Sequence, residues 1–156
     1  MHLLKVYRLC LANLPCLALV AAMLVIPAVT QAEDQEIGEY TVHYIAVNST
    51  FLDPDIAAQY NIVRSARRGF INVAVLHNNA DGTTSPVTAL VTGGKRNLLQ
   101  QSSELLFQEV KEGEAIYYLA QFEFSNAENL RFTVQVQPEQ AGKTYPIEWS
   151  TALYAD

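Results

Sequence analysis

The sequence predicts an all-β fold, an antiparallel β-sandwich with one short helical insert. Apolar and polar residues alternate in several short runs, which is the pattern of a strand with one buried face. Turn-forming residues separate these runs at short intervals, and seven or eight strands spaced in this way are typical of a sandwich. The alternation argues against a parallel sheet, because strands of parallel sheets are usually apolar on both faces.

The clearest strand lies at residues 130–137, where Leu130, Phe132, Val134 and Val136 share one face. We expect further strands at 116–124, 71–75 and 145–150, and residues 41–50, rich in β-branched and aromatic residues, begin the domain. Residues 87–92 and 105–110 have a weaker pattern, and we expect strands there as well. Glycine, asparagine and aspartate predict turns at 78–82, 93–94, 112–113, 125–129 and 140–143.

One segment departs from the strand pattern and predicts a helix at about residues 54–60. Asp53 is a suitable N-cap, and Pro54 follows at the first helical position. Ile56, Ala57 and Tyr60 then share a helical face, and Asn61 can close the final turn.

The first 32 residues have the order of a secretory signal peptide. Lys5 and Arg8 precede an apolar run, and Thr30 and Ala32 occupy the −3 and −1 positions of a cleavage site after about Ala32. The alternative is an N-terminal membrane anchor, but the apolar run is short for a span of about 20 residues. We therefore expect a periplasmic protein with no membrane span after cleavage. Residues 33–156 would form one domain, with 33–36 as a flexible leader.

Composition narrows the classes of partner and chemistry. Removal of Lys5 and Arg8 lowers the net charge from −6 to −8, which argues against nucleic acid and against anionic membrane surfaces as partners. Cys10 and Cys16 both lie within the predicted leader. The domain therefore has neither a disulfide nor a thiol nucleophile, and hydrophobic packing must hold it together.

No motif of catalysis or metal binding stands out. After residue 32 the chain has only two histidines, His43 and His77, whereas a zinc site usually takes three or four ligands. We expect these histidines to be hydrogen-bonded to backbone or solvent, and we expect no metal and no cofactor. There is no Gly-x-Ser-x-Gly elbow, and a Ser–His–Asp arrangement stays an alternative because its members are distant from one another in a sequence.

The most unusual local feature is the run Arg64-Ser65-Ala66-Arg67-Arg68, which holds three of the eight basic residues after position 32. Guanidinium groups match carboxylates and phosphates, so one interpretation is a site for an anionic ligand or partner near Tyr60. The other is a surface loop whose arginines pair with acids such as Asp53 and Asp55, at up to about 1 kcal/mol per pair.

Several blocks of the sequence resemble a known family. These blocks are Asn48-Ser49-Thr50-Phe51-Leu52, Pro54 with Ile56-Ala57, Tyr60 with Arg64-Ser65, Asn72-Val73 with Val75-Leu76, Asn97-Leu98-Leu99, and Ile116-Tyr117-Tyr118-Leu119-Ala120. Together, over about residues 36–154, they resemble the exported bacterial proteins of domain of unknown function 4426. The resemblance implies an immunoglobulin-like sandwich and a periplasmic location, and it implies no activity.

We therefore expect an uncharacterised periplasmic protein that acts as a non-enzymatic binding or accessory module of the cell envelope. Its partner would be an envelope protein or a small anionic ligand. The candidate binding residues are Asn48, Thr50, Tyr60, Arg64, Ser65 and Arg68. Two alternatives stay open: a periplasmic hydrolase acting on envelope material, in which His43 or His77 approaches a serine or carboxylate, and an assembly module working through an exposed strand edge.

Overall fold

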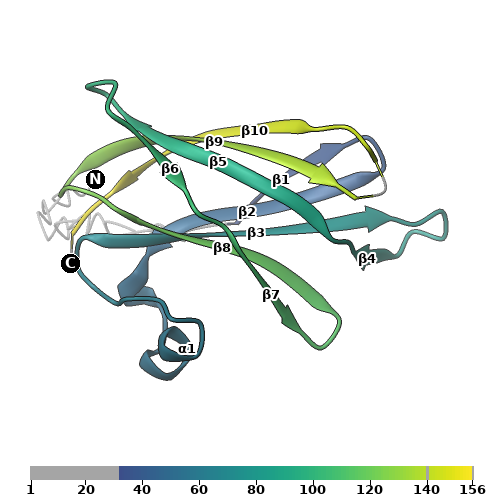
Figure 1. Cartoon of the computed structure of the whole chain (residues 1–156), viewed down its shortest axis with the longest axis horizontal. Coiled ribbons are helices and arrows are strands. Elements are labelled where there is room, and N and C mark those ends of the chain that lie inside the picture. Colours follow the sequence, from purple (N-terminus) through teal and green to yellow (C-terminus); the bar gives the residue numbers. More distant parts are fainter. Residues whose placement is uncertain (1–31, 140, 156) are drawn as a thin grey trace, which may run out of the picture.

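The computed structural model describes residues 32–139 and 141–155, which form two antiparallel sheets packed face to face (Figure 1). The first sheet contains, in spatial order, β1 (Glu33–Ile37), β2 (Tyr40–Asn48), β3 (Arg68–Asn78), β8 (Ala115–Glu123) and β7 (Gln108–Glu112), with β4 (Thr84–Pro86) also paired to β3. The second contains β10 (Tyr145–Leu153), β9 (Glu128–Pro138), β5 (Ala89–Asn97) and β6 (Ser102–Leu105). The predicted β-sandwich is confirmed.

The strand order is that of an immunoglobulin-like domain. In such domains strands A, B, E and D form one sheet, and G, F, C and C′ form the other. The order β2-β3-β8-β7 corresponds to the first set, and β10-β9-β5-β6 corresponds to the second. Strand β1 is an addition, which forms a hairpin with β2 at the edge of the first sheet.

The core lies between the sheets and follows the alternation seen in the sequence. In β9, Leu130, Phe132, Val134 and Val136 are all buried, whereas the residues between them are exposed or half-buried. The Phe132 ring stacks on Trp149 of β10 at 5.0 Å, and it meets Phe122 of β8 edge-on at 5.1 Å. Because Phe122 belongs to the opposite sheet, this aromatic cluster joins the two layers.

The α-helix α1 (Pro54–Gln59) confirms the predicted insert, and a 3-10 helix, η1 (Ser49–Phe51), precedes it. The Asp53 carboxylate accepts a hydrogen bond from the backbone N–H of Asp55 at 2.9 Å, as an N-cap does. Asn61 then takes the left-handed conformation, with φ of 55°, and ends the helix. Ala57 of the helix packs with Ile62 and with Phe70 of β3. The helix therefore covers part of the outer face of the first sheet.

Two expectations at the strand ends were wrong. Residues 33–36 are not a flexible leader, because they pair with β2 from Glu33↔Tyr44 to Glu36↔Thr41. Residues 105–110 are not one strand: β6 ends at Leu105 in the second sheet, and β7 begins at Gln108 in the first. The chain crosses between the sheets through residues 106–107, and residues 105–110 contain no glycine, proline or asparagine that would signal such a crossing.

The predicted turn at Gly93-Gly94 was also wrong, since both glycines lie inside β5. A Cβ atom on Gly93 would lie 2.5 Å from the carbonyl oxygen of Thr133 in β9. Glycine at this position therefore permits the close approach of two strands rather than a change of direction. The hairpin turn falls four residues later, after Asn97.

Candidate functional site

The loop that carries the arginine run is fastened to the end of β2 by a buried serine. The Ser49 hydroxyl donates to the carbonyl of Ser65 at 3.2 Å, and it accepts from the backbone N–H of Ser65 at 2.9 Å. The neighbouring Asn48 side chain donates to the carbonyl of Tyr154 at 2.7 Å. These contacts use the polar groups of Asn48 and Ser49 to hold the backbone in place.

The structure brings four of the six predicted binding residues together: Asn48, Thr50, Arg64 and Ser65. Arg64 lies over this junction, where its guanidinium donates to the carbonyl of Thr50 at 2.9 Å. The other two lie elsewhere. The hydroxyl of Tyr60 donates to the carboxylate of Glu112 in β7, and Arg68 pairs with Glu123 of β8 at 2.7 Å.

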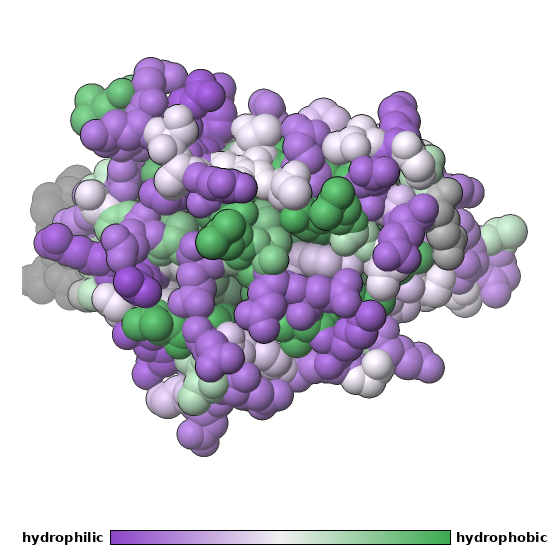
Figure 2. Space-filling model, in the orientation of Figure 1, coloured by the Kyte–Doolittle hydropathy of each residue, from purple (hydrophilic) through white to green (hydrophobic). Residues whose placement is uncertain are grey.

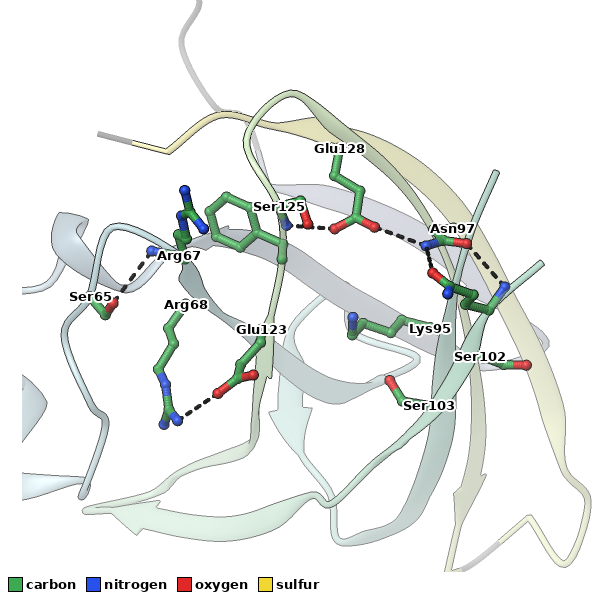
Figure 3. Close-up of a pocket in the computed structure, with 12 residues that line it drawn as sticks. Ser65, Arg67, Arg68, Lys95, Asn97, Ser102, Ser103, Glu123, Ser125 and Glu128 are labelled. Carbon is green, nitrogen blue, oxygen red and sulfur yellow. Dashed lines mark hydrogen bonds and ion pairs between the residues drawn. The ribbon is translucent and has the colours of Figure 1, made fainter. Parts of the chain in front are cut away.

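A polar cleft opens between the two sheets beside the arginine run (Figure 3). Its volume is about 520 Å³, and a second hollow of about 490 Å³ shares Arg68, Lys95, Ser103 and Glu123 with it. Residues at the ends of five strands and of the loops that join them line the cleft. They are Ser65, Arg67, Arg68, Lys95, Asn97, Gln101, Ser102, Ser103, Glu123, Phe124, Ser125 and Glu128.

Both carboxylates of the cleft are engaged by other groups. Glu123 pairs with Arg68, and Glu128 accepts hydrogen bonds from the N–H of Ser125 at 2.7 Å and from the side chain of Asn97 at 3.1 Å. Burial by itself would raise the pKa of Glu128, but these two hydrogen bonds and the charge of Lys95 outweigh it and lower that pKa. Glu128 is therefore held ionised at neutral pH.

Two cations of the cleft, Arg67 and Lys95, have no ion pair within the described part of the chain. Figure 3 shows Lys95 pointing from β5 into the cleft, and it lies opposite Ser103 in the pairing of β5 with β6. A lysine ammonium, a guanidinium fork and serine hydroxyls are the donors that bind carboxylates and phosphates. The cleft can therefore hold a small anion, although the whole domain is acidic.

The predicted site and this cleft overlap only at Ser65 and Arg68. Arg67 belongs to the arginine run but was left out of the predicted set. Lys95 was not predicted, because Thr92-Gly93-Gly94-Lys95-Arg96 lacks the full Gly-x-x-x-x-Gly-Lys-Ser/Thr spacing of a phosphate loop and was interpreted as a hairpin turn. The adjacent basic residues Lys95 and Arg96 were the available signal in the sequence.

The two histidines lie apart from the cleft. His43 is exposed on β2, and the Nδ1 atom of His77 lies 2.9 Å from the side-chain oxygen of Asn79. The Nε2 atom of His77 lies 3.6 Å from Glu39. Among the described residues no group of three or more histidine, cysteine or acidic side chains is close enough to hold a metal ion.

Comparison with known proteins identifies the family. The family described as a domain of unknown function, DUF4426, matches residues 34–156. This chain belongs to the DUF4426 family. A crystal structure of a DUF4426 family protein from Pseudomonas aeruginosa PAO1, PA0388, shares 34% identity with it, covering 80% of this chain and 96% of that one with a TM-score of 0.69. The resemblance read from the sequence is confirmed.

More distant structures share the fold of this DUF4426 protein. FetP of the uropathogenic Escherichia coli strain F11, recombinantly expressed in the periplasm of E. coli, is 12% identical to this chain. The match covers 80% of this chain and 94% of FetP, with a TM-score of 0.57. A copper-bound variant of FetP is also 12% identical to this chain. That match covers 80% of this chain and 95% of the variant, with a TM-score of 0.56. A search of curated proteins finds no significant match.

The predicted leader lies outside the described residues, except for Ala32. Among the residues that are described, no helix is long and apolar enough to cross a membrane.

Proposed function

We propose that this protein is an exported, periplasmic binding module without catalytic activity, and that it binds a small anion bearing a carboxylate or phosphate group. The observation that carries the proposal is the pair Arg67 and Lys95, which line the cleft without an ion pair among the described residues. Lys95 also lies 6.0 Å from the centre of the Phe122 ring, and its charge acts on Glu128. Cations without a direct ion pair attract anions when the site is partly shielded from water. The order of charged, apolar and small residues in the first 32 positions supports export.

The edges of the sheets give less support to assembly by strand pairing. Edge strands that pair with partners are usually long and free of charge and proline. Three of the five residues in β1 are acidic, and β7 carries Glu109, Lys111 and Glu112. Strand β6 has only four residues, and β10 contains Pro146. Each edge thus has a feature that discourages pairing.

The copper of the FetP variant does not carry over to this chain. Copper sites in proteins draw on cysteine, methionine and histidine. All cysteines and methionines of this sequence precede residue 32, and the described histidines and acids form no ligand cluster. The residues present do not fit the metal, and we assign it no role here.

The hydrolase alternative also has weaker support than anion binding. Neither histidine lines the cleft, and the separation of 3.6 Å between His77 and Glu39 exceeds an ordinary hydrogen bond.

The double substitution Arg67→Gln and Lys95→Gln should abolish binding of the anion. Native mass spectrometry of the protein purified from its own periplasm would detect the ligand as a reproducible additional mass. We expect this mass to disappear in the double variant and to persist in Arg64→Ala, because Arg64 contacts Thr50 and lies outside the cleft lining. If no ligand is retained, titration with inorganic phosphate and with citrate, followed by NMR, takes its place.

Two results would contradict the proposal. Retention of the ligand by the double variant would place it outside the cleft. Loss of the ligand in Arg64→Ala alone would place it at the junction of Asn48, Thr50 and Arg64 instead.

A further inference from the structure

The hairpin between β5 and β6 presents two leucines to solvent. Leu98 is 75% exposed and Leu99 is 79% exposed, and Figure 2 shows hydrophobic surface at this projecting tip, at the upper left, bordered by hydrophilic side chains. The turn is well held, because the Asn97 side chain accepts from the N–H of Gln101 at 3.0 Å and the Asn97 carbonyl accepts from the N–H of Gln100 at 3.0 Å. A rigid turn of this kind has no structural need for two apolar residues.

Two arginines lie side by side just behind the tip. Arg96 of β5 and Arg131 of β9 are directly opposite each other in the strand pairing. Like charges in this arrangement destabilise a sheet. Arg131 has no ion pair or hydrogen bond from its guanidinium within the described residues, and that of Arg96 only donates to the side-chain oxygen of Gln100 at 3.3 Å. The pair is thus available to an external anion.

A hollow of about 290 Å³ lies between the leucine tip and the arginine pair. The hollow is lined by Arg96, Arg131, Leu98, Asn129 and Ser150, with Asn97, Gln100 and Leu130. Two guanidinium forks with amide and hydroxyl donors suit a phosphate group, and Leu98 adds an apolar wall on the side of the tip.

The basic residues of the domain are distributed unevenly along its length. Six of the eight basic residues after position 32 lie toward the end of the sandwich that carries this tip: Arg64, Arg67, Arg68, Lys95, Arg96 and Arg131 (Figure 1). Lys111, in β7, and Lys143, between β9 and β10, lie toward the opposite end. The same end also carries Glu104 opposite Gly94, Glu123 paired with Arg68, and Glu128 hydrogen-bonded to Asn97. Arg96 and Arg131 stay without an ion pair among the described residues, and because salt screens charges over about 8–10 Å, a surface that meets the tip responds mainly to the groups close to it.

We propose that the β5–β6 hairpin docks the protein on an anionic phospholipid bilayer. Leu98 and Leu99 insert between the headgroups, and Arg96 and Arg131 bind a lipid phosphate. The tip is convex and both leucines are exposed, so a deformable medium can surround them together, whereas a protein partner would need a matching pocket. Basic residues around an apolar insertion are the combination that holds proteins at anionic membrane surfaces. The hollow shares Asn97 with the cleft of the proposed function, but neither Arg96 nor Arg131 lines that cleft.

Sedimentation with vesicles tests the proposal. The processed protein would be mixed with vesicles of phosphatidylglycerol and phosphatidylethanolamine, and with uncharged vesicles of phosphatidylcholine and phosphatidylethanolamine. We expect binding to the charged vesicles that weakens as salt is raised. The charge-neutral double variant Leu98→Ser and Leu99→Ser, and separately Arg96→Gln with Arg131→Gln, should each lower the affinity by about tenfold or more.

Two control variants change a residue of strand β5 away from the tip and a residue at the opposite end of the sandwich. Leu90→Ser removes a leucine of β5 that is 62% exposed but distant from the tip, and Lys143→Gln removes one positive charge at the far end. Both should bind vesicles as the unmodified protein does, and thermal unfolding should confirm that every variant is folded.

Several outcomes would overturn the proposal. They are an absence of binding to charged vesicles, equal binding to uncharged ones, and binding that survives the leucine substitutions. Release from vesicles by millimolar glycerol phosphate would identify a site for free phosphates instead of a membrane contact. A protein partner captured through the tip, without vesicle binding, would assign the surface to that partner.

Discussion

Replacing Gly93 with alanine is expected to lower the free energy of unfolding by about 3 kcal/mol. The added Cβ would lie 2.5 Å from the carbonyl oxygen of Thr133 and 3.0 Å from the Cα of Val134. Both atoms belong to the backbone of β9, so no side-chain rotation can relieve the clash. Strands β5 and β9 are paired over nine positions, from Ala89↔Pro138 to Asn97↔Leu130, and a local separation would strain their shared ladder.

Urea denaturation of the purified protein would measure this change. Thr92→Ala, at an exposed position of the same strand, should change stability by less than about 0.5 kcal/mol. The loss of stability in Gly94→Ala should lie between those of Gly93→Ala and Thr92→Ala, because its added Cβ meets only the Ser103 carbonyl oxygen closely, at 3.0 Å. A cost below about 1 kcal/mol for Gly93→Ala would mean that the two strands are not packed as closely as described.

Replacing Tyr118 with phenylalanine should cost about 2 kcal/mol, because it removes a hydroxyl that ties the two sheets together. This hydroxyl accepts from the backbone N–H of Ala89 in β5 at 2.7 Å, and it donates to the carboxylate of Glu109 in β7 at 3.0 Å. Ala89 and Tyr118 are both buried, so the variant leaves an N–H without a partner inside the protein. Tyr117→Phe, on the neighbouring half-buried side chain, should have little effect.

The pH dependence of the same variant provides a second measurement. Burial, together with the hydrogen bond to Glu109 and the charge of Glu109, raises the pKa of Tyr118 to about 12 against the opposing effect of the Ala89 N–H. A tyrosine whose pKa is raised by folding stabilises the native state below its ordinary pKa of 10.0, and this contribution is lost between about pH 10 and 12. The stability gap between the unmodified protein and Tyr118→Phe should therefore narrow over this range. A constant gap would contradict the assigned hydrogen bonds.

The contrast between β9 and the crossing at residues 106–107 indicates which parts of the fold sequence could predict. Alternation at 130–137 depends only on each residue facing the core or solvent, and the strand appears as predicted. The helix at Pro54–Gln59 was similarly predictable, because Asp53 and Asn61 act on backbone groups a few residues away. The crossing depends on residues 102–105 pairing with the strand before them and residues 108–112 with the strand after them, in different sheets, and packing across the sandwich decides this.

The charged residues illustrate the same limit at the candidate site. Net charge, the two early cysteines and the leader pattern are properties of the sequence alone, and they determine the expected compartment and the absence of disulfides after residue 32. Composition, however, averages over the surface. It argued against nucleic acid and anionic membrane surfaces as partners, although six basic residues lie toward one end of the domain.

By itself, the sequence determined the β-sandwich, its helical insert and the DUF4426 family, since periodicity, capping and family blocks are local or linear features. Only the tertiary structure decided that Arg67, Lys95 and Ser103 line one cleft, and that Arg96 lies beside Arg131. The physical reason is strand register. A shift of one residue would turn every side chain to the other face, and register is set by packing across the whole sandwich.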